Sequence, residues 1–315
     1  MSIVAMSETV GSLGDEIGRA VAGALGYEFA DREIITNAAA RFGEGVLELR
    51  HAAEEKPTLW ERFAETQRRY RAYIEATVFE LAARDNMILV GRAAPVILAD
   101  TPHTLRVRVD APERLRAERV AQREGLTPAA ALDYLRSTDR ERAARVRFFY
   151  GVPLDDPLLY DLVLDSERLG VPQCTAIVCI TLDHERFRST DASRRAMLDR
   201  SLEAQARAAL LAEPTTRRYR FAVTCADGVI TLGGGADAVQ VRQVAEDAVA
   251  RIPGVGRVQN AIDVVAGLAE EDVEDNVHGQ FRHGEERSWG GYGGGWYERE
   301  RQARRPRGGG GSRAA

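Results

Sequence analysis

Apolar runs that end at glycine turns constrain most strongly how this chain can fold. Residues 86–90 form an almost continuous apolar segment that stops at Gly91, which is typical of a strand buried on both faces of a parallel sheet. Residues 2–6 (SIVAM) predict a similar strand, followed by a glycine turn and an amphipathic helix over 15–25. Such strand–turn–helix units indicate a parallel sheet with helices on its faces.

Further segments repeat this alternation as far as residue 171. We expect short strands at 27–29, 104–109 and 159–164, and helices after Asp31, over 58–83, from 111 and over 129–147. Strands that alternate with helices predict an α/β fold.

The pattern changes after Val171, where a helix over 173–182 leads into a polar, arginine-rich stretch. A compact αββαβ unit follows, with a hairpin turn at Asp227-Gly228. Its predicted elements are a helix over 197–211, strands over 219–225 and 229–232, a helix over 238–252 and a strand over 257–265. We therefore predict one domain over 1–183, a linker over 184–196 and a second domain over 197–266.

The last segment, 267–315, combines an acidic cluster, aromatic residues among glycines, and arginines. It cannot bury enough apolar surface to fold, so we predict disorder. Arginines and aromatics could contact RNA or acidic partners, but the acidic cluster could equally pair with the arginines.

Charge and cysteine content narrow the functional classes. The net charge of −5 gives no strong case for nucleic acid or an anionic membrane as a partner. All but one of the 43 basic residues are arginine, which a GC-rich genome explains, and the exception is Lys56. The three cysteines lie in apolar stretches without metal-site spacing, as expected of free thiols in a reducing compartment. No signal peptide or transmembrane segment is evident, so we expect a cytoplasmic protein.

The turn Gly11-Ser12-Leu13-Gly14 joins the first strand to the first helix. Backbone amides and the positive end of the helix dipole hold anions at such a turn, and glycine lets the backbone approach them closely. The turn lacks the lysine and the Ser/Thr of a complete phosphate-binding loop. On its own it is also typical of a plain strand-to-helix connection.

Six segments in the same order make residues 3–166 resemble the cytidylate kinase-like family, a branch of the P-loop nucleoside monophosphate kinases. They are SETVGSLGDEIG (7–18), LGYEFADREII (25–35), LVGRA (89–93), DAPERLRAERVAQR (110–123), DRER (139–142) and YDLVLD (160–165).

The resemblance implies a three-layer P-loop kinase fold and phosphoryl transfer from ATP, with Mg²⁺, to a nucleoside monophosphate such as CMP. It assigns roles to nine residues. Gly11, Ser12 and Gly14 would cradle the donor phosphates, and Asp31 and Arg92 would face the acceptor nucleotide. Arg116, Arg119 and Arg142 would close over the transferring group, and Asp139 would orient Arg142. No protein side chain is assigned to a metal.

Three residues depart from the family pattern at the phosphate turn. Glu8 and Asp15 stand where the family carries arginines, and Leu13 stands where it carries glycine. Each reversed charge would weaken phosphate binding by an amount on the order of a few kcal/mol. The two carboxylates could instead help to hold Mg²⁺.

Residues 197–265 resemble a BON domain. The matching pieces are the helix before Ala208, the hairpin CADGVITLG (225–233) and the segment IPGVGRV (252–258) that leads to Asn260. The resemblance implies binding of a phospholipid surface or another ligand, often in cell-envelope proteins, whereas a packing or oligomerisation role explains the same residues.

Three functions follow from these features. The chain could be an ATP-dependent nucleoside monophosphate kinase with an appended sensor, or a catalytically degenerate kinase-fold protein coupled to a BON module. It could also be a membrane-associated adaptor. Glu8 and Asp15 at the phosphate turn separate the first from the second.

Overall fold

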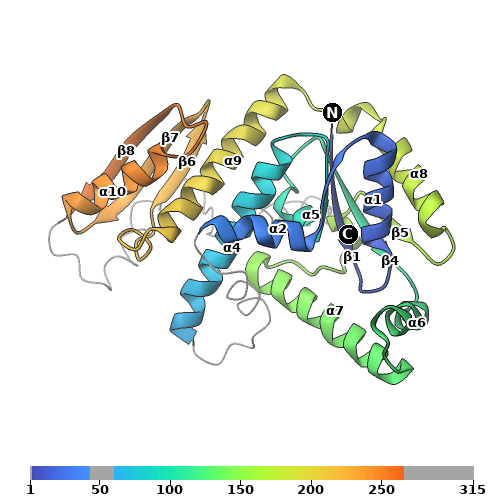
Figure 1. The fold of residues 1–315 in the computed structure, drawn as a ribbon. Coiled ribbons are helices and arrows are strands. Elements are labelled where there is room, and N and C mark those ends of the chain that lie inside the picture. Colours follow the sequence, from blue (N-terminus) through green and yellow to red (C-terminus); the bar gives the residue numbers. More distant parts are fainter. Residues whose placement is uncertain (1, 43–59, 92, 266–315) are drawn as a thin grey trace, which may run out of the picture.

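The computed structural model describes residues 2–42, 60–91 and 93–265. Its larger unit (Figure 1) is built on a five-stranded parallel sheet. The strand order in this sheet is β2-β3-β1-β4-β5. The strands are β1 (Ile3–Glu8), β2 (Glu28–Ala30), β3 (Met87–Val90), β4 (Thr104–Asp110) and β5 (Leu162–Asp165). The two apolar runs become the centre of the sheet, where β1 pairs with β3 and β4.

Seven α-helices of the described residues surround this sheet. They are α1 (Gly14–Leu25), α2 (Arg32–Ala39), α4 (Trp60–Ala82), α5 (Ala94–Ile97), α6 (Glu113–Glu124), α7 (Pro128–Tyr150) and α8 (Gly170–Leu182). Short 3-10 turns lie at Ala40–Phe42, Pro157–Leu159 and Glu185–Phe187. The predicted α/β class and the three-layer arrangement are confirmed.

The sheet has a buried core on each face, because alternate residues of a strand point to opposite sides. On one face, Val4 and Met6 pack with Ile17 of α1 and Val178 of α8. On the other, Ile3 and its neighbours pack with α4, α5 and the end of α7. Helices α6 and α7 lie beyond the carboxyl edge of the strands, next to the loop that joins β1 to α1 (Figure 1).

The second unit is the predicted αββαβ arrangement. It contains α9 (Asp191–Ala212), β6 (Ala222–Ala226), β7 (Val229–Ala236), α10 (Val239–Ala250) and β8 (Arg257–Val264). Strand β7 pairs antiparallel with β6 and parallel with β8. Asp227 and Gly228 both have positive φ at the hairpin, as a two-residue turn of this kind requires.

Helix α9 belongs to both units. Leu202, Ala206 and Leu210 enter the core of the small sheet, whereas Met197 and Ala208 enter the core around α4. The helix begins at Asp191, inside the stretch predicted as a linker, because Thr190 and Ser193 form a capping box at its start. The small unit is therefore packed on the larger one through a helix that they share.

Several predicted features need qualification. Of the three free cysteines, Cys174 is buried, and Cys179 and Cys225 are half-buried. The tail predicted to be disordered, 267–315, lies outside the described residues, as does the first part of the helix predicted over 58–83. In the described part of the chain, no helix is long and apolar enough to cross a bilayer.

Candidate functional site

The loop between β1 and α1 keeps the backbone form of an anion-binding turn. Gly11 and Leu13 have φ angles of 78° and 68°, and Leu13 is the residue before the first turn of α1. A Cβ on Gly11 would lie 2.7 Å from the carbonyl oxygen of Arg116, so only glycine fits there. Leu13 adopts a left-handed conformation that costs a side chain about 1–2 kcal/mol.

Ser12 holds the loop to its own first residues and to the end of β4. Its side chain is buried and its hydroxyl donates to the carbonyl oxygens of Thr9 at 2.8 Å and Val109 at 3.0 Å. The hydroxyl is thus turned toward the end of β4. Ser12 fixes the shape of the turn through these bonds.

Glu8 lies at the position where a bound anion is expected. A Cβ on Gly14 would be 2.6 Å from both Cβ and Oε2 of Glu8, so the carboxyl group packs directly against the first residue of α1. The backbone amide of Asp15 also forms a hydrogen bond with this carboxyl group. Amides at a helix start bind anions, and here the chain's own carboxyl group occupies that place.

Burial raises the pKa of Glu8 to about 7, with the charge of Asp15 adding to the increase. The Arg142 guanidinium lowers the pKa of Glu8 by less, since its Nη1 is 4.0 Å from Oε1. Burial, then Asp31 and Glu16, raise the pKa of Asp15. Two carboxyl groups that are hard to ionise together therefore lie at the start of α1.

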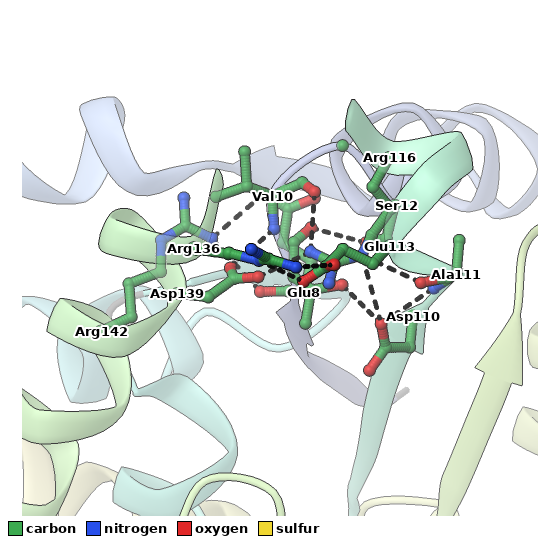
Figure 2. Close-up of polar contacts among 12 residues, drawn as sticks. Glu8, Val10, Ser12, Asp110, Ala111, Glu113, Arg116, Arg136, Asp139 and Arg142 are labelled. Atoms are coloured by element: carbon green, nitrogen blue, oxygen red, sulfur yellow. Dashed lines mark hydrogen bonds and ion pairs between the residues drawn. The ribbon is translucent and has the colours of Figure 1, made fainter. Parts of the chain in front are cut away.

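Arg116 and Asp139 hold the loop to α6 and α7 (Figure 2). The guanidinium of Arg116 donates to the carbonyl oxygens of Ala111 at 2.9 Å and Val10 at 3.1 Å, and it lies 2.6 Å from Asp139. Asp139 also accepts the backbone N–H of Val10 at 3.0 Å. Asp139 thus positions Arg116, whereas the family resemblance predicted that it would orient Arg142.

The other two predicted closing arginines also contact the loop. Nη1 of Arg119 donates to the carbonyl oxygen of Gly11 and to the hydroxyl of Ser166, both at 3.1 Å. Nη1 of Arg142 donates to the carbonyl oxygen of Glu8 at 3.2 Å. Unlike Arg116, both line a cavity, and each guanidinium has more N–H groups than its contacts in this region use.

The two residues predicted to face an acceptor nucleotide have different outcomes. Asp31 forms an ion pair of 2.7 Å with Arg19 and accepts the backbone N–H of Glu33 at the start of α2. These two contacts hold the start of α2, and a role of Asp31 toward an acceptor nucleotide stays a prediction. Arg92 lies outside the described residues, so its role stays a prediction.

A cavity of about 610 Å³ opens between the loop, α4 and α7. Its end near the loop is lined by Glu8, Gly11, Leu13, Asp15, Arg32, Arg119 and Arg142. Its far end is lined by Tyr70, Arg71, Ile74, Val146, Phe149 and Tyr150. One end is thus rich in charge and the other in aromatic rings.

Comparison with protein families shows to which family this chain belongs. The model of the cytidylate kinase-like family matches residues 3–168, more than half of the chain. The chain belongs to the cytidylate kinase-like family. The BON domain model matches residues 199–266, so a BON domain follows the kinase-like domain.

Curated relatives include cytidylate kinases of archaea. The chain is 32% identical to that of Pyrococcus furiosus over 127 residues, which are 40% of this chain and 64% of the relative. It is 29% identical to that of Natronomonas pharaonis over 177 residues, which are 56% of this chain and 86% of the relative. The chain therefore spans slightly less than two thirds of the Pyrococcus enzyme.

Solved structures that resemble the chain are more distant in sequence. An uncharacterized protein from Eubacterium ventriosum has a TM-score of 0.48 at 18% identity, covering 59% of this chain and all of that one. A shikimate kinase from Bacteroides thetaiotaomicron has a TM-score of 0.39 at 14% identity, covering 58% and 99%.

ATP, which the cytidylate kinase-like family implies, does not fit the loop as it stands. Oε2 of Glu8 lies against Gly14, where a donor phosphate would approach the amides, and Asp15 adds a second carboxyl group beside it. Among the described residues, no group of three or more His, Cys, Asp or Glu side chains could hold a metal ion.

Sequence reasoning found one end of the cavity. Of the predicted site residues, Gly11, Arg119 and Arg142 line it, whereas Ser12, Gly14, Asp31, Arg116 and Asp139 do not. It missed the aromatic end, whose members are Tyr70, Arg71, Phe149 and Tyr150. In the sequence, Tyr70, Phe149 and Tyr150 look like ordinary core residues, and Arg71 looks like any other arginine of an amphipathic helix, so no local signal marks them.

Proposed function

We propose that this chain is a nucleotide-binding protein that holds a nucleoside monophosphate in the cavity between α4 and α7, without efficient phosphoryl transfer at neutral pH. One observation carries the second half of this proposal. The Glu8 carboxyl group lies against Gly14, at the start of α1. In this proposal the acceptor site in the cavity binds a nucleotide, whereas the donor site at the phosphate turn does not bind ATP well.

The shape and charge of the cavity support binding of a nucleoside monophosphate. Its volume of about 610 Å³ is in the usual range for small-molecule sites. Arg32, Arg119 and Arg142 offer cationic donors suited to a phosphate group. Tyr150 and Phe149 offer aromatic surface suited to a base at the other end.

Electrostatics disfavour a triphosphate at the loop. A polyphosphate would have to displace the Glu8 carboxyl group from the amide of Asp15 and approach the Asp15 carboxylate. Unfavourable charge contacts of this kind cost on the order of a few kcal/mol, which corresponds to a roughly 100-fold loss of affinity. We therefore expect weak binding of ATP and little ADP formation.

Calorimetric titration of the full chain at pH 8 tests both the binding of a monophosphate and the weak binding of ATP. CMP, UMP, AMP and GMP are titrated separately, then ATP with Mg²⁺, and ADP formation is followed with each acceptor. We expect at least one monophosphate to bind, and ATP to bind only in Glu8→Gln. The matched control is Glu118→Gln, which changes an exposed carboxylate on α6. Failure of every monophosphate to bind refutes the proposal.

An active kinase is the second candidate, and one observation favours it. With a pKa of about 7, Glu8 is largely protonated in mildly acidic solution, and its repulsion of phosphate is then reduced. This candidate predicts that the wild-type chain forms ADP at a rate that rises as pH falls from 8 to 6. A rate that stays at background over this range contradicts it.

The BON domain is proposed to act as a ligand-binding or regulatory module. Its support is the family match and the helix α9 that it shares with the kinase-like domain. Sedimentation with anionic and with neutral liposomes tests a phospholipid ligand. Absence of co-sedimentation with both would contradict a phospholipid ligand.

A further inference from the structure

Arg71 is a charged residue at the aromatic end of the cavity, where the surrounding side chains are mostly apolar. It lies on α4, and its side chain is 19% exposed. It is one of the residues that line the cavity. A guanidinium in such a place needs partners, because an unpaired buried charge is strongly unfavourable.

Three contacts hold Arg71 in one orientation. Nε donates to Oε1 of Glu75, one turn along α4, at 2.8 Å. Nη1 donates to the carbonyl oxygen of Phe149 at 2.8 Å, which is one of the unpaired carbonyls in the last turn of α7. The guanidinium carbon lies 4.9 Å from the centre of the Tyr150 ring, a favourable cation–π distance.

The partners of Arg71 are themselves fixed. Glu75 is 8% exposed and also forms a hydrogen bond with the hydroxyl of Tyr150. Burial, and then the Glu75 charge, raise the pKa of Tyr150 well above its usual value, so this hydroxyl stays protonated and donates to Glu75. The orientation of the guanidinium is therefore set before any ligand enters.

One edge of the guanidinium remains available. Within the described part of the chain, Nη2 of Arg71 has no hydrogen-bond acceptor, and Nη1 carries a second N–H beside it. Because the residue lines the cavity, a bound ligand can replace water as the acceptor for these groups. The neighbouring Tyr70, Ile74 and Phe149 provide apolar and aromatic surface against which a planar ring can pack.

We propose that Arg71 is the base-recognition residue of this cavity, and that it selects a ring edge with two adjacent hydrogen-bond acceptors. Cytosine offers O2 and N3, and guanine offers O6 and N7. On their Watson–Crick and Hoogsteen edges, uracil and adenine present no two adjacent acceptors, because a donor stands beside each acceptor there. The inference rests on the proposed binding of a nucleoside monophosphate and adds which bases are accepted and which residue decides.

The test compares ratios of affinity in the full chain. CMP, GMP, UMP, AMP and ribose 5-phosphate are titrated into wild type, Arg71→Lys and Arg71→Gln. Lysine keeps the charge but cannot present a two-pronged edge. The control is Arg147→Lys, an exposed position on α7 that does not line the cavity. A ratio is insensitive to partial unfolding, because both ligands meet the same folded fraction.

We expect wild type to bind CMP or GMP at least about tenfold more tightly than UMP and AMP, the discrimination of one two-pronged contact. In Arg71→Lys and Arg71→Gln the ratio should fall toward one, while affinity for ribose 5-phosphate changes little. Equal affinities in wild type, or an unchanged ratio in both Arg71 variants, would overturn this inference alone. No binding of any ligand would overturn the proposed function as well.

Discussion

Replacing Glu8 with Gln should make the protein more stable at alkaline pH. The pKa of Glu8 moves from 4.5 to about 7 in the folded chain. At about 1.36 kcal/mol per pKa unit, the ionised carboxylate is less favourable by ~3 kcal/mol when folded than when unfolded. Glutamine keeps the shape and removes the ionisation, so it removes this penalty.

The sign and the pH range follow from the raised pKa. Below about pH 4.5 the carboxyl group is protonated in both states and carries no penalty. Between about pH 4.5 and 7 the folded state binds more protons, so wild-type stability falls as pH rises, and above this range the full penalty remains. The advantage of Glu8→Gln should thus be small at pH 5 and approach ~3 kcal/mol at pH 8.

Urea unfolding followed by circular dichroism at pH 5 and pH 8 measures this difference. Asp15 also has a raised pKa, but it is present in both proteins and its titration largely cancels in the comparison. The control Glu118→Gln should change stability by less than about 0.5 kcal/mol at either pH. An equal effect of Glu8→Gln at both pH values would show that the carboxyl group does not lie buried at the start of α1.

Four further substitutions test the supports of the site and the contact between the two units. Arg116→Met, which removes the contacts to Asp139 and two carbonyl oxygens, should lower the unfolding free energy by about 3 kcal/mol in urea; a loss below 1 kcal/mol contradicts a structural role. Gly11→Ala should destabilise the protein by about 2 kcal/mol or more, because position 11 has no room for a Cβ atom. Leu13→Gly should be neutral or stabilising by up to ~1 kcal/mol, because the left-handed backbone at position 13 strains a side chain. Thermal melting of both variants checks these opposite signs. Met197→Ala, at the α4–α9 contact, should cost about 2–4 kcal/mol and lower the melting of both units in calorimetry, whereas an unchanged BON transition would show that they unfold independently.

Much of the fold could be predicted because its signals are local. An apolar run such as 86–90 is typical of a strand buried on both faces. The Asp227-Gly228 pair is typical of a two-residue hairpin turn, which needs two positive φ angles. The start of α9 was predicted at 197 and lies at Asp191. Its first turn is polar because it is exposed, so hydrophobic periodicity misses it, and the capping pair Thr190 and Ser193 was the available signal.

The site was harder to predict because it depends on which side chains meet. The charge reversal at Glu8 is visible in the sequence, but its contact with Gly14 depends on the exit angle of β1. The family resemblance assigned Asp139 to Arg142, whereas the packing of α6 on α7 brings Asp139 to Arg116. Arg71 is one of several arginines on α4, and its role follows from the end of α7, 78 residues away in sequence.

A crystal structure of the wild-type chain soaked at pH 8 with CMP and a non-hydrolysable ATP analogue tests the central claim most directly. We predict density for the monophosphate between α4 and α7, the Glu8 carboxyl group against Gly14, and no polyphosphate on the amides of residues 11–15. Polyphosphate density on those amides, with Glu8 turned away from α1, would contradict the account.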